Sequence, residues 1–118
     1  MRTCTLLALF LLAGTPLAFA QDPVEVAGDH YSVILENDDV RVLRIQYGPG
    51  DRTAMHYHPD GVAIFVTNSS FRFTMPDGST VEASGAAGET IWAPGGAHSP
   101  ENMGSEPAEV ILVELKRD

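Results

Sequence analysis

Cysteine is almost absent from this 118-residue sequence, and the single one, Cys4, lies in an apolar N-terminal segment. That segment, MRTCTLLALFLLAGTPLAFA, begins with a basic residue, continues with a Leu-rich run and ends in Ala-Phe-Ala. This layout is typical of a secretory signal peptide. We therefore expect residues 1–20 to be removed as a signal peptide and the protein to be periplasmic or secreted. Since Cys4 would leave with them, disulfides are excluded in the mature chain.

Long hydrophobic runs and basic residues are also scarce. The apolar run from Leu6 to Ala13 is shorter than the roughly 20 residues of a bilayer-spanning helix. Cys4 does not follow the expected cleavage site directly, so no lipid anchor is predicted. Without Arg2, six of the seven basic residues and all sixteen acidic residues remain, for a net charge of −10. This charge argues against nucleic acid and against membrane surfaces as partners.

A helical repeat of apolar residues is missing as well. After residue 20 the sequence consists of short apolar segments separated by Gly, Pro, Asn and Asp, and Asp77-Gly78 is a strong hairpin signal. We expect an N-terminal arm over residues 21–30 and an all-β barrel or sandwich over 31–118. The expected strands are 31–36, 40–47, 54–58, 62–67, 71–75, 80–83, 89–93, 97–101 and 109–115.

Histidines are few, but two of them stand one residue apart in MHYH, residues 55–58. Because side chains alternate along a strand, His56 and His58 point to the same face. Residues 62, 64 and 66 would share that face if the turn at Pro59 preserved the register. His98 follows a Gly-rich turn that can aim its side chain inward. Three imidazoles form a plausible ligand set for a divalent transition metal (Fe, Zn, Cu, Ni or Mn).

Each group of histidines lies in a segment with a recognisable pattern of glycines and other residues. The segment GDRTAMHYH, residues 50–58, has a Gly, five residues and then His-x-His. The segment GETIWAPGGAHSPEN, residues 88–102, has a Gly, five residues, a Pro, a Gly and then a His. The chain is similar to small single-domain cupins of the RmlC-like, cupin-2 type. The resemblance implies a double-stranded β-helix, also called a jelly-roll barrel, and a metal site formed by His56, His58 and His98.

The sequence departs from the cupin pattern in two ways. The pattern usually has a metal-binding Glu four or five residues after the second His, and Val62 and Ala63 stand there instead. The segment between Gly96 and His98 is one residue shorter than usual. Two other acids lie near the histidines in sequence, and Asp60 and Glu101 are alternative oxygen ligands. The alternative to a ligand role is a turn residue for Asp60 and a solvent-facing residue for Glu101.

The resemblance implies two classes of function. Cupins with three histidines and no Glu include non-haem iron dioxygenases, so a metal-dependent dioxygenase acting on a small molecule is the first interpretation. Cupins that have lost ligands can lack a metal, so a non-catalytic barrel that binds or senses a small molecule or metal is the alternative. The sequence assigns no catalytic residue. By resemblance we also expect a homodimer, which would cover exposed strand edges.

Overall fold

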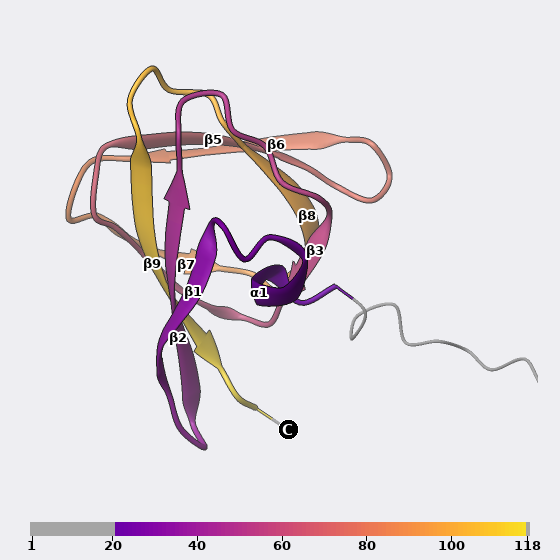
Figure 1. Cartoon of the computed structure of the whole chain (residues 1–118), viewed down its shortest axis with the longest axis vertical. Coiled ribbons are helices and arrows are strands. Elements are labelled where there is room, and N and C mark those ends of the chain that lie inside the picture. The colour runs from indigo at the N-terminus through magenta and orange to yellow at the C-terminus, as the bar shows by residue number, and fades with distance from the viewer. Residues whose placement is uncertain (1–20, 118) are drawn as a thin grey trace, which may run out of the picture.

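The computed structural model describes residues 21–117, so the expected signal peptide lies outside the described residues. Nine strands and one short helix form the described chain (Figure 1). The helix is α1 (Pro23–Val26), and no helix in this part of the chain is long and apolar enough to cross a membrane. The strands are β1 (Tyr31–Glu36), β2 (Val40–Tyr47), β3 (His56–His58), β4 (Gly61–Phe65), β5 (Ser69–Thr74), β6 (Thr80–Gly85), β7 (Thr90–Ala93), β8 (Gly96–Asn102) and β9 (Ala108–Leu115).

The strands form two antiparallel sheets that enclose a common interior (Figure 1). One sheet has the order β1-β2-β9-β4-β7, and the other has the order β3-β8-β5-β6. Consecutive strands often belong to different sheets, so the chain crosses repeatedly between them. This is an all-β jelly-roll architecture, as the sequence predicted. Each expected strand corresponds to one observed strand, and the bounds of β1 and β2 agree residue for residue.

Two turns determine how the strands on either side of them are placed. Asp77-Gly78 joins β5 to its antiparallel partner β6, where Gly78 adopts a φ of +86° that other residues rarely reach. The turn at Pro59 instead carries the chain from one sheet to the other. Gly61, Ala63 and Phe65 are buried on β4, so the turn does not preserve the register and residues 62, 64 and 66 do not share the histidine face. The change of sheet shifts the inward positions by one residue.

The N-terminal residues 21–30 pack against the barrel. Asp22 caps α1 by accepting a hydrogen bond from the Val24 backbone N–H at 2.8 Å. Pro23 and Ala27 are buried, and the backbone N–H of Tyr57 on β3 donates to the Gln21 carbonyl. The arm therefore covers the end of the barrel beside β3.

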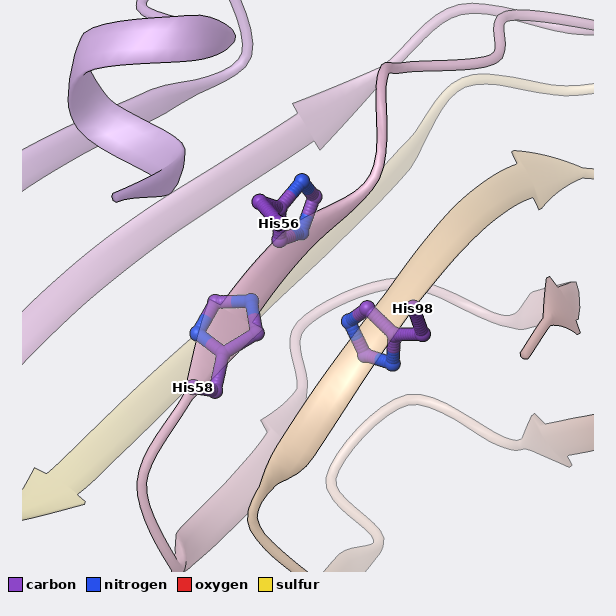
Figure 2. Close-up of side chains that lie close together, drawn as sticks. All are labelled: His56, His58 and His98. Carbon is purple, nitrogen blue, oxygen red and sulfur yellow. The ribbon is translucent and has the colours of Figure 1, made fainter. Parts of the chain in front are cut away.

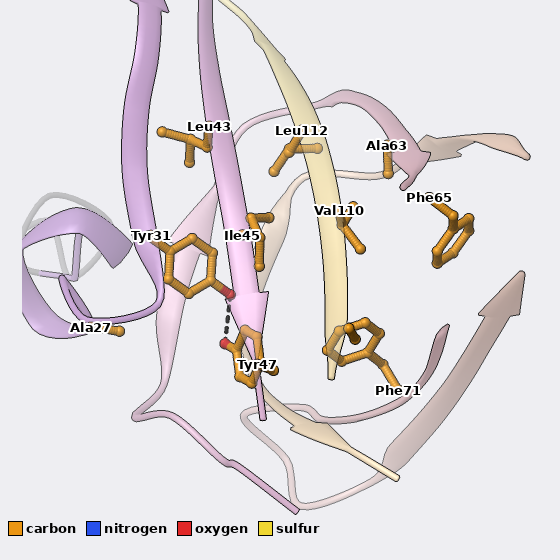
Figure 3. Close-up of a cluster of buried hydrophobic side chains, with 11 residues drawn as sticks. Ala27, Tyr31, Leu43, Ile45, Tyr47, Ala63, Phe65, Phe71, Val110 and Leu112 are labelled. Atoms are coloured by element: carbon orange, nitrogen blue, oxygen red, sulfur yellow. Dashed lines mark hydrogen bonds between the residues drawn. The ribbon is translucent and has the colours of Figure 1, made fainter. Parts of the chain in front are cut away.

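The core lies between the sheets and is built from alternate residues of β2, β4 and β9 (Figure 3). Inward positions on β2 and β9 follow the period of two expected for strands with one buried face. The cluster comprises Ala27, Tyr31, Leu43, Ile45, Tyr47, Ala63, Phe65, Phe71, Ala108, Val110 and Leu112. Several of these core residues also line a cavity, described below.

The burial of Leu43 predicts its contribution to stability. Leu43 is fully buried, whereas Leu35 on the neighbouring strand is 51% exposed. We expect Leu43→Ala to lower the free energy of unfolding by about 2–5 kcal/mol and the matched control Leu35→Ala to change it by no more than about 0.5 kcal/mol. Urea denaturation measures both. Equal losses in the two variants would contradict the assignment of the core.

Candidate metal centre

The antiparallel register of β3 and β8 brings the three histidines together. His56 lies directly opposite His98, and His58 lies opposite Gly96. Since opposite residues in an antiparallel pair point to the same face, His98 shares the inward face with His56 and, by alternation, with His58. Figure 2 shows the three rings close together on one face of the strand pair, with His56 and His58 over β3 and His98 over β8.

The ring nitrogens of this cluster are close to one another. One ligand atom from each histidine lies within 4.8 Å of the other two. The three rings meet edge to face, with centroid separations of 4.9–5.2 Å. His56 and His58 are buried, and the ring of Phe73 stacks against His98 at 4.6 Å. The cluster is thus enclosed by protein while its nitrogens converge.

Hydrogen bonds fix the outward nitrogens of two rings. Nδ1 of His56 lies 2.9 Å from the Ala54 carbonyl oxygen, which only accepts, so this nitrogen carries the hydrogen. Nδ1 of His58 lies 2.7 Å from Oε2 of Glu114. The Nε2 atoms of His56 and His98 are buried and have no hydrogen-bond partner. Buried polar atoms are normally paired, so these two nitrogens are suited to an ion.

The environment keeps two of these imidazoles neutral. Burial, together with the neighbouring His58, lowers the pKa of His56 to about 4. Burial and the other two histidines lower the pKa of His98 to about 3. A neutral imidazole offers the lone pair that a transition metal requires. The residues present therefore fit a divalent transition metal.

Behind His58, a chain of charged groups links the cluster to the N-terminal arm. Glu114 is 2% exposed, and its Oε1 accepts a 2.7 Å hydrogen bond from Nε of Arg41. Arg41 also donates to Asp22 at 2.7 Å. Burial opposes ionisation of Glu114, but the hydrogen bonds from His58 and Arg41 outweigh it and hold its pKa below the ordinary value. A carboxylate in this position orients a metal-binding histidine.

Sequence reasoning missed Glu114 and its pairing with Arg41, although a signal was available. Glu114 continues the buried series Ala108, Val110 and Leu112 at a period of two, so alternation along β9 places it inside. Arg41 lies opposite Glu114 in the β2–β9 pair. A charged residue at an inward position of a strand indicates a buried pair.

The alternative oxygen ligands lie elsewhere. Asp60 accepts hydrogen bonds from the Gly95 backbone N–H at 2.6 Å and from Arg117 at 3.0 Å, which commits it to the turn. Glu101 is three residues from His98 and so lies on the opposite face of β8. Among the described residues, the cluster of potential metal ligands contains only the three histidines. Ala63 faces inward and lines the cavity beside them, where the cupin pattern has its Glu.

A cavity of about 400 Å³ adjoins the histidines. His58 and His98 lie in its wall together with Tyr31 and Tyr47. The two tyrosine hydroxyls lie 2.7 Å apart (Figure 3). The hydroxyl of Tyr47 also lies 2.7 Å from Oγ1 of Thr53. Burial raises the pKa of Tyr47 to about 12, and burial also holds the pKa of Tyr31 well above its ordinary value. Both phenols are therefore neutral.

Comparison with solved structures gives the same fold. A cupin domain from Bordetella pertussis Tohama I matches with a TM-score of 0.67 and 25% identity, over 74% of this chain and 92% of that one. A double-stranded β-helix protein from Klebsiella pneumoniae matches with a TM-score of 0.58 and 27% identity, over 73% and 75%. The polyketide cyclase RemF from Streptomyces resistomycificus, at 22% identity and a TM-score of 0.52 over 74% and 64%, shares the fold. No protein-family model and no curated protein matches the chain.

These findings define the chain as a double-stranded β-helix protein with three converging histidines. Within that class, the solved structures to which the chain is similar include a cupin domain, in agreement with the two cupin-like motifs of the sequence.

The lowered histidine pKa values predict acid sensitivity of the metal-free protein. In the unfolded chain these histidines bind protons near their ordinary pKa of about 6.5, before the folded state does. The free energy of unfolding should therefore fall as the pH drops from about 6.5 to 4, by about 1.4 kcal/mol per pH unit for each such histidine. Urea titrations with chelator measure this slope. His98→Phe should reduce it, and an unchanged slope would contradict the assignment.

Glu114 predicts a second difference in stability. Glu114→Ala leaves Arg41 and His58 without their buried partner, so we expect a loss of about 3–5 kcal/mol. Glu109→Ala on the same strand is the matched control, because Glu109 only accepts bonds at the surface, and its loss should stay below about 1 kcal/mol. Thermal and urea denaturation compare the two. Similar losses in the two variants would show that the buried carboxylate of Glu114 stabilises the fold no more than the surface carboxylate of Glu109.

Proposed function

We propose that this cupin is exported and binds a divalent transition metal through His56, His58 and His98, and that it catalyses dioxygenation of a small molecule. One observation carries the proposal: two buried Nε2 atoms without hydrogen-bond partners belong to neutral imidazoles that converge with a third. Two features of the cavity support the proposal: it adjoins His58 and His98, and its wall is predominantly apolar.

The protein's own groups have distinct roles in this proposal. The Ala54 carbonyl and Glu114 hold the Nδ1 atoms of His56 and His58, which turns their Nε2 atoms toward the interior. Arg41 keeps Glu114 ionised. A redox-active ion at this site supplies the electron transfer and open ligand positions that dioxygen chemistry requires, whereas zinc supplies Lewis acidity. Because the three ligands would be imidazoles and none a carboxylate, the ligand set itself would carry no negative charge.

A non-catalytic binding barrel is the second candidate. The polar groups around the histidines are already engaged: Glu114 with Arg41 and His58, and Tyr31 with Tyr47. A general acid or base needs a group that can exchange a proton with substrate. The engaged state of these groups favours binding over proton transfer.

Metal content and oxygen uptake test the proposal. Mature protein purified from periplasm without an affinity tag should contain near-stoichiometric Fe, Cu, Zn, Ni or Mn by elemental mass spectrometry. The double variant His56→Ala/His98→Ala should lose that metal, because it removes both unpaired nitrogens, whereas the matched control His30→Ala should retain it. Iron- or copper-loaded protein should consume oxygen in the presence of small ketones, diketones or phenols.

Three results would decide against parts of this account. If unaltered protein carries no metal and added metal leaves its melting temperature unchanged, the metal site is wrong. If metal is stoichiometric but no oxygen is consumed, the binding barrel replaces the dioxygenase. Export fails as a proposal if the protein stays in the cytoplasm with its first twenty residues attached.

A further inference from the structure

The walls of the cavity restrict the kind of molecule that it can hold. Its volume of about 400 Å³ lies in the range of small-molecule sites. Aromatic side chains make up much of its wall, namely Phe65, Phe71, Phe73 and Trp92. Among the described residues, no Asp, Glu, Lys or Arg lines it. The body of a ligand would therefore meet almost only carbon.

Apart from the indole of Trp92, the polar side chains of the wall lie in one region. His58 and His98 belong to the metal cluster, and Tyr31 packs edge-on against His56 at 4.9 Å between ring centroids. The Tyr31 hydroxyl bonds that of Tyr47, so both lie beside the histidines. A ligand thus finds the imidazoles and the tyrosine hydroxyls of the wall together at its histidine end.

One charged side chain, Arg117, lies beside Trp92 at the edge of the cavity, and it is already paired with Asp60. The guanidinium of Arg117 lies 5.8 Å from the centre of the Trp92 ring, and it donates to Asp60 at 3.0 Å. An ionised ligand inside the cavity would lose its hydration and find no opposite charge on the wall. Burying an unpaired charge costs far more than burying a neutral group.

We infer that the cavity binds a neutral, predominantly apolar small molecule whose single polar end faces the histidines, and not an amino acid, sugar acid or other charged metabolite. This rests on the proposed function only for the orientation of the polar end. The apolar body and the neutrality follow from the wall itself. The half-exposed Trp92, the single tryptophan of the chain, is a built-in reporter of binding.

Three probes with the same ring system test the inference. Chelator-treated protein is titrated calorimetrically with 2-naphthylmethanol, 2-naphthoate and 2-naphthylmethylammonium. We expect the neutral alcohol to bind about tenfold or more tightly than either ion, because the wall offers the ions no partner. Removal of metal ensures that the carboxylate gains nothing from coordination.

Two pairs of variants locate the binding. Ala83→Phe fills the cavity and should abolish binding of the alcohol, whereas Ala87→Phe, outside the cavity, should preserve it. Val81 lies at the exposed rim, so Val81→Lys should leave the fold intact and raise the affinity for naphthoate about tenfold by supplying a cation. The matched control Val66→Lys is exposed outside the cavity and should leave naphthoate binding unchanged.

The outcomes separate this inference from the proposed function. Equal affinity for the three probes, no binding of the alcohol, or an unchanged naphthoate affinity in Val81→Lys overturns the inference. If the protein as purified carries no metal but the chelator-treated protein binds the alcohol, the inference about the cavity holds and the proposed metal site is wrong. If the protein as purified carries stoichiometric metal but does not bind the alcohol, the metal site holds and the inference about the cavity is wrong.

Discussion

The pairing of β3 with β8 is the constraint on which the site depends. It sets His56 opposite His98, and the alternation of side chains then adds His58 to the same inward face. If the pairing shifted by one residue, His98 would face the opposite side of the sheet from His56 and His58, and the three rings would no longer be together. Backbone hydrogen bonds therefore determine the geometry of the site before any ligand arrives.

The same interior serves two opposed requirements. Burial keeps His56 and His98 neutral, with pKa values of about 4 and about 3, and gives the cavity its apolar wall. Burial also makes the charge on Glu114 costly, and the ion pair with Arg41 offsets that cost. Asp22 connects this pair to the arm, so the first described residues help to support the histidines.

Much of the fold could be predicted from the sequence, because it depends on local patterns. The His-x-His pair is also a local pattern, whereas the grouping of His98 with it followed from the resemblance to the cupins. Short apolar segments and turn residues marked the nine strands, and the Asp77-Gly78 turn marked the hairpin. The register beyond Pro59 could not be predicted, because the turn changes sheets. Glu114 is 56 residues from His58, and only the pairing of β9 with β2 and β4 brings it behind the ring. Long-range contacts of this kind leave a weak trace in a single sequence.

X-ray absorption spectroscopy at the edge of the bound metal tests the central claim most directly, because it counts imidazole ligands without assuming a reaction. The account predicts that the native protein shows three imidazoles with the remaining positions filled by light atoms, and that His98→Phe shows fewer imidazoles. A carboxylate-dominated shell, or a native spectrum that His98→Phe leaves unchanged, would contradict the claim that the β3–β8 register creates the metal centre.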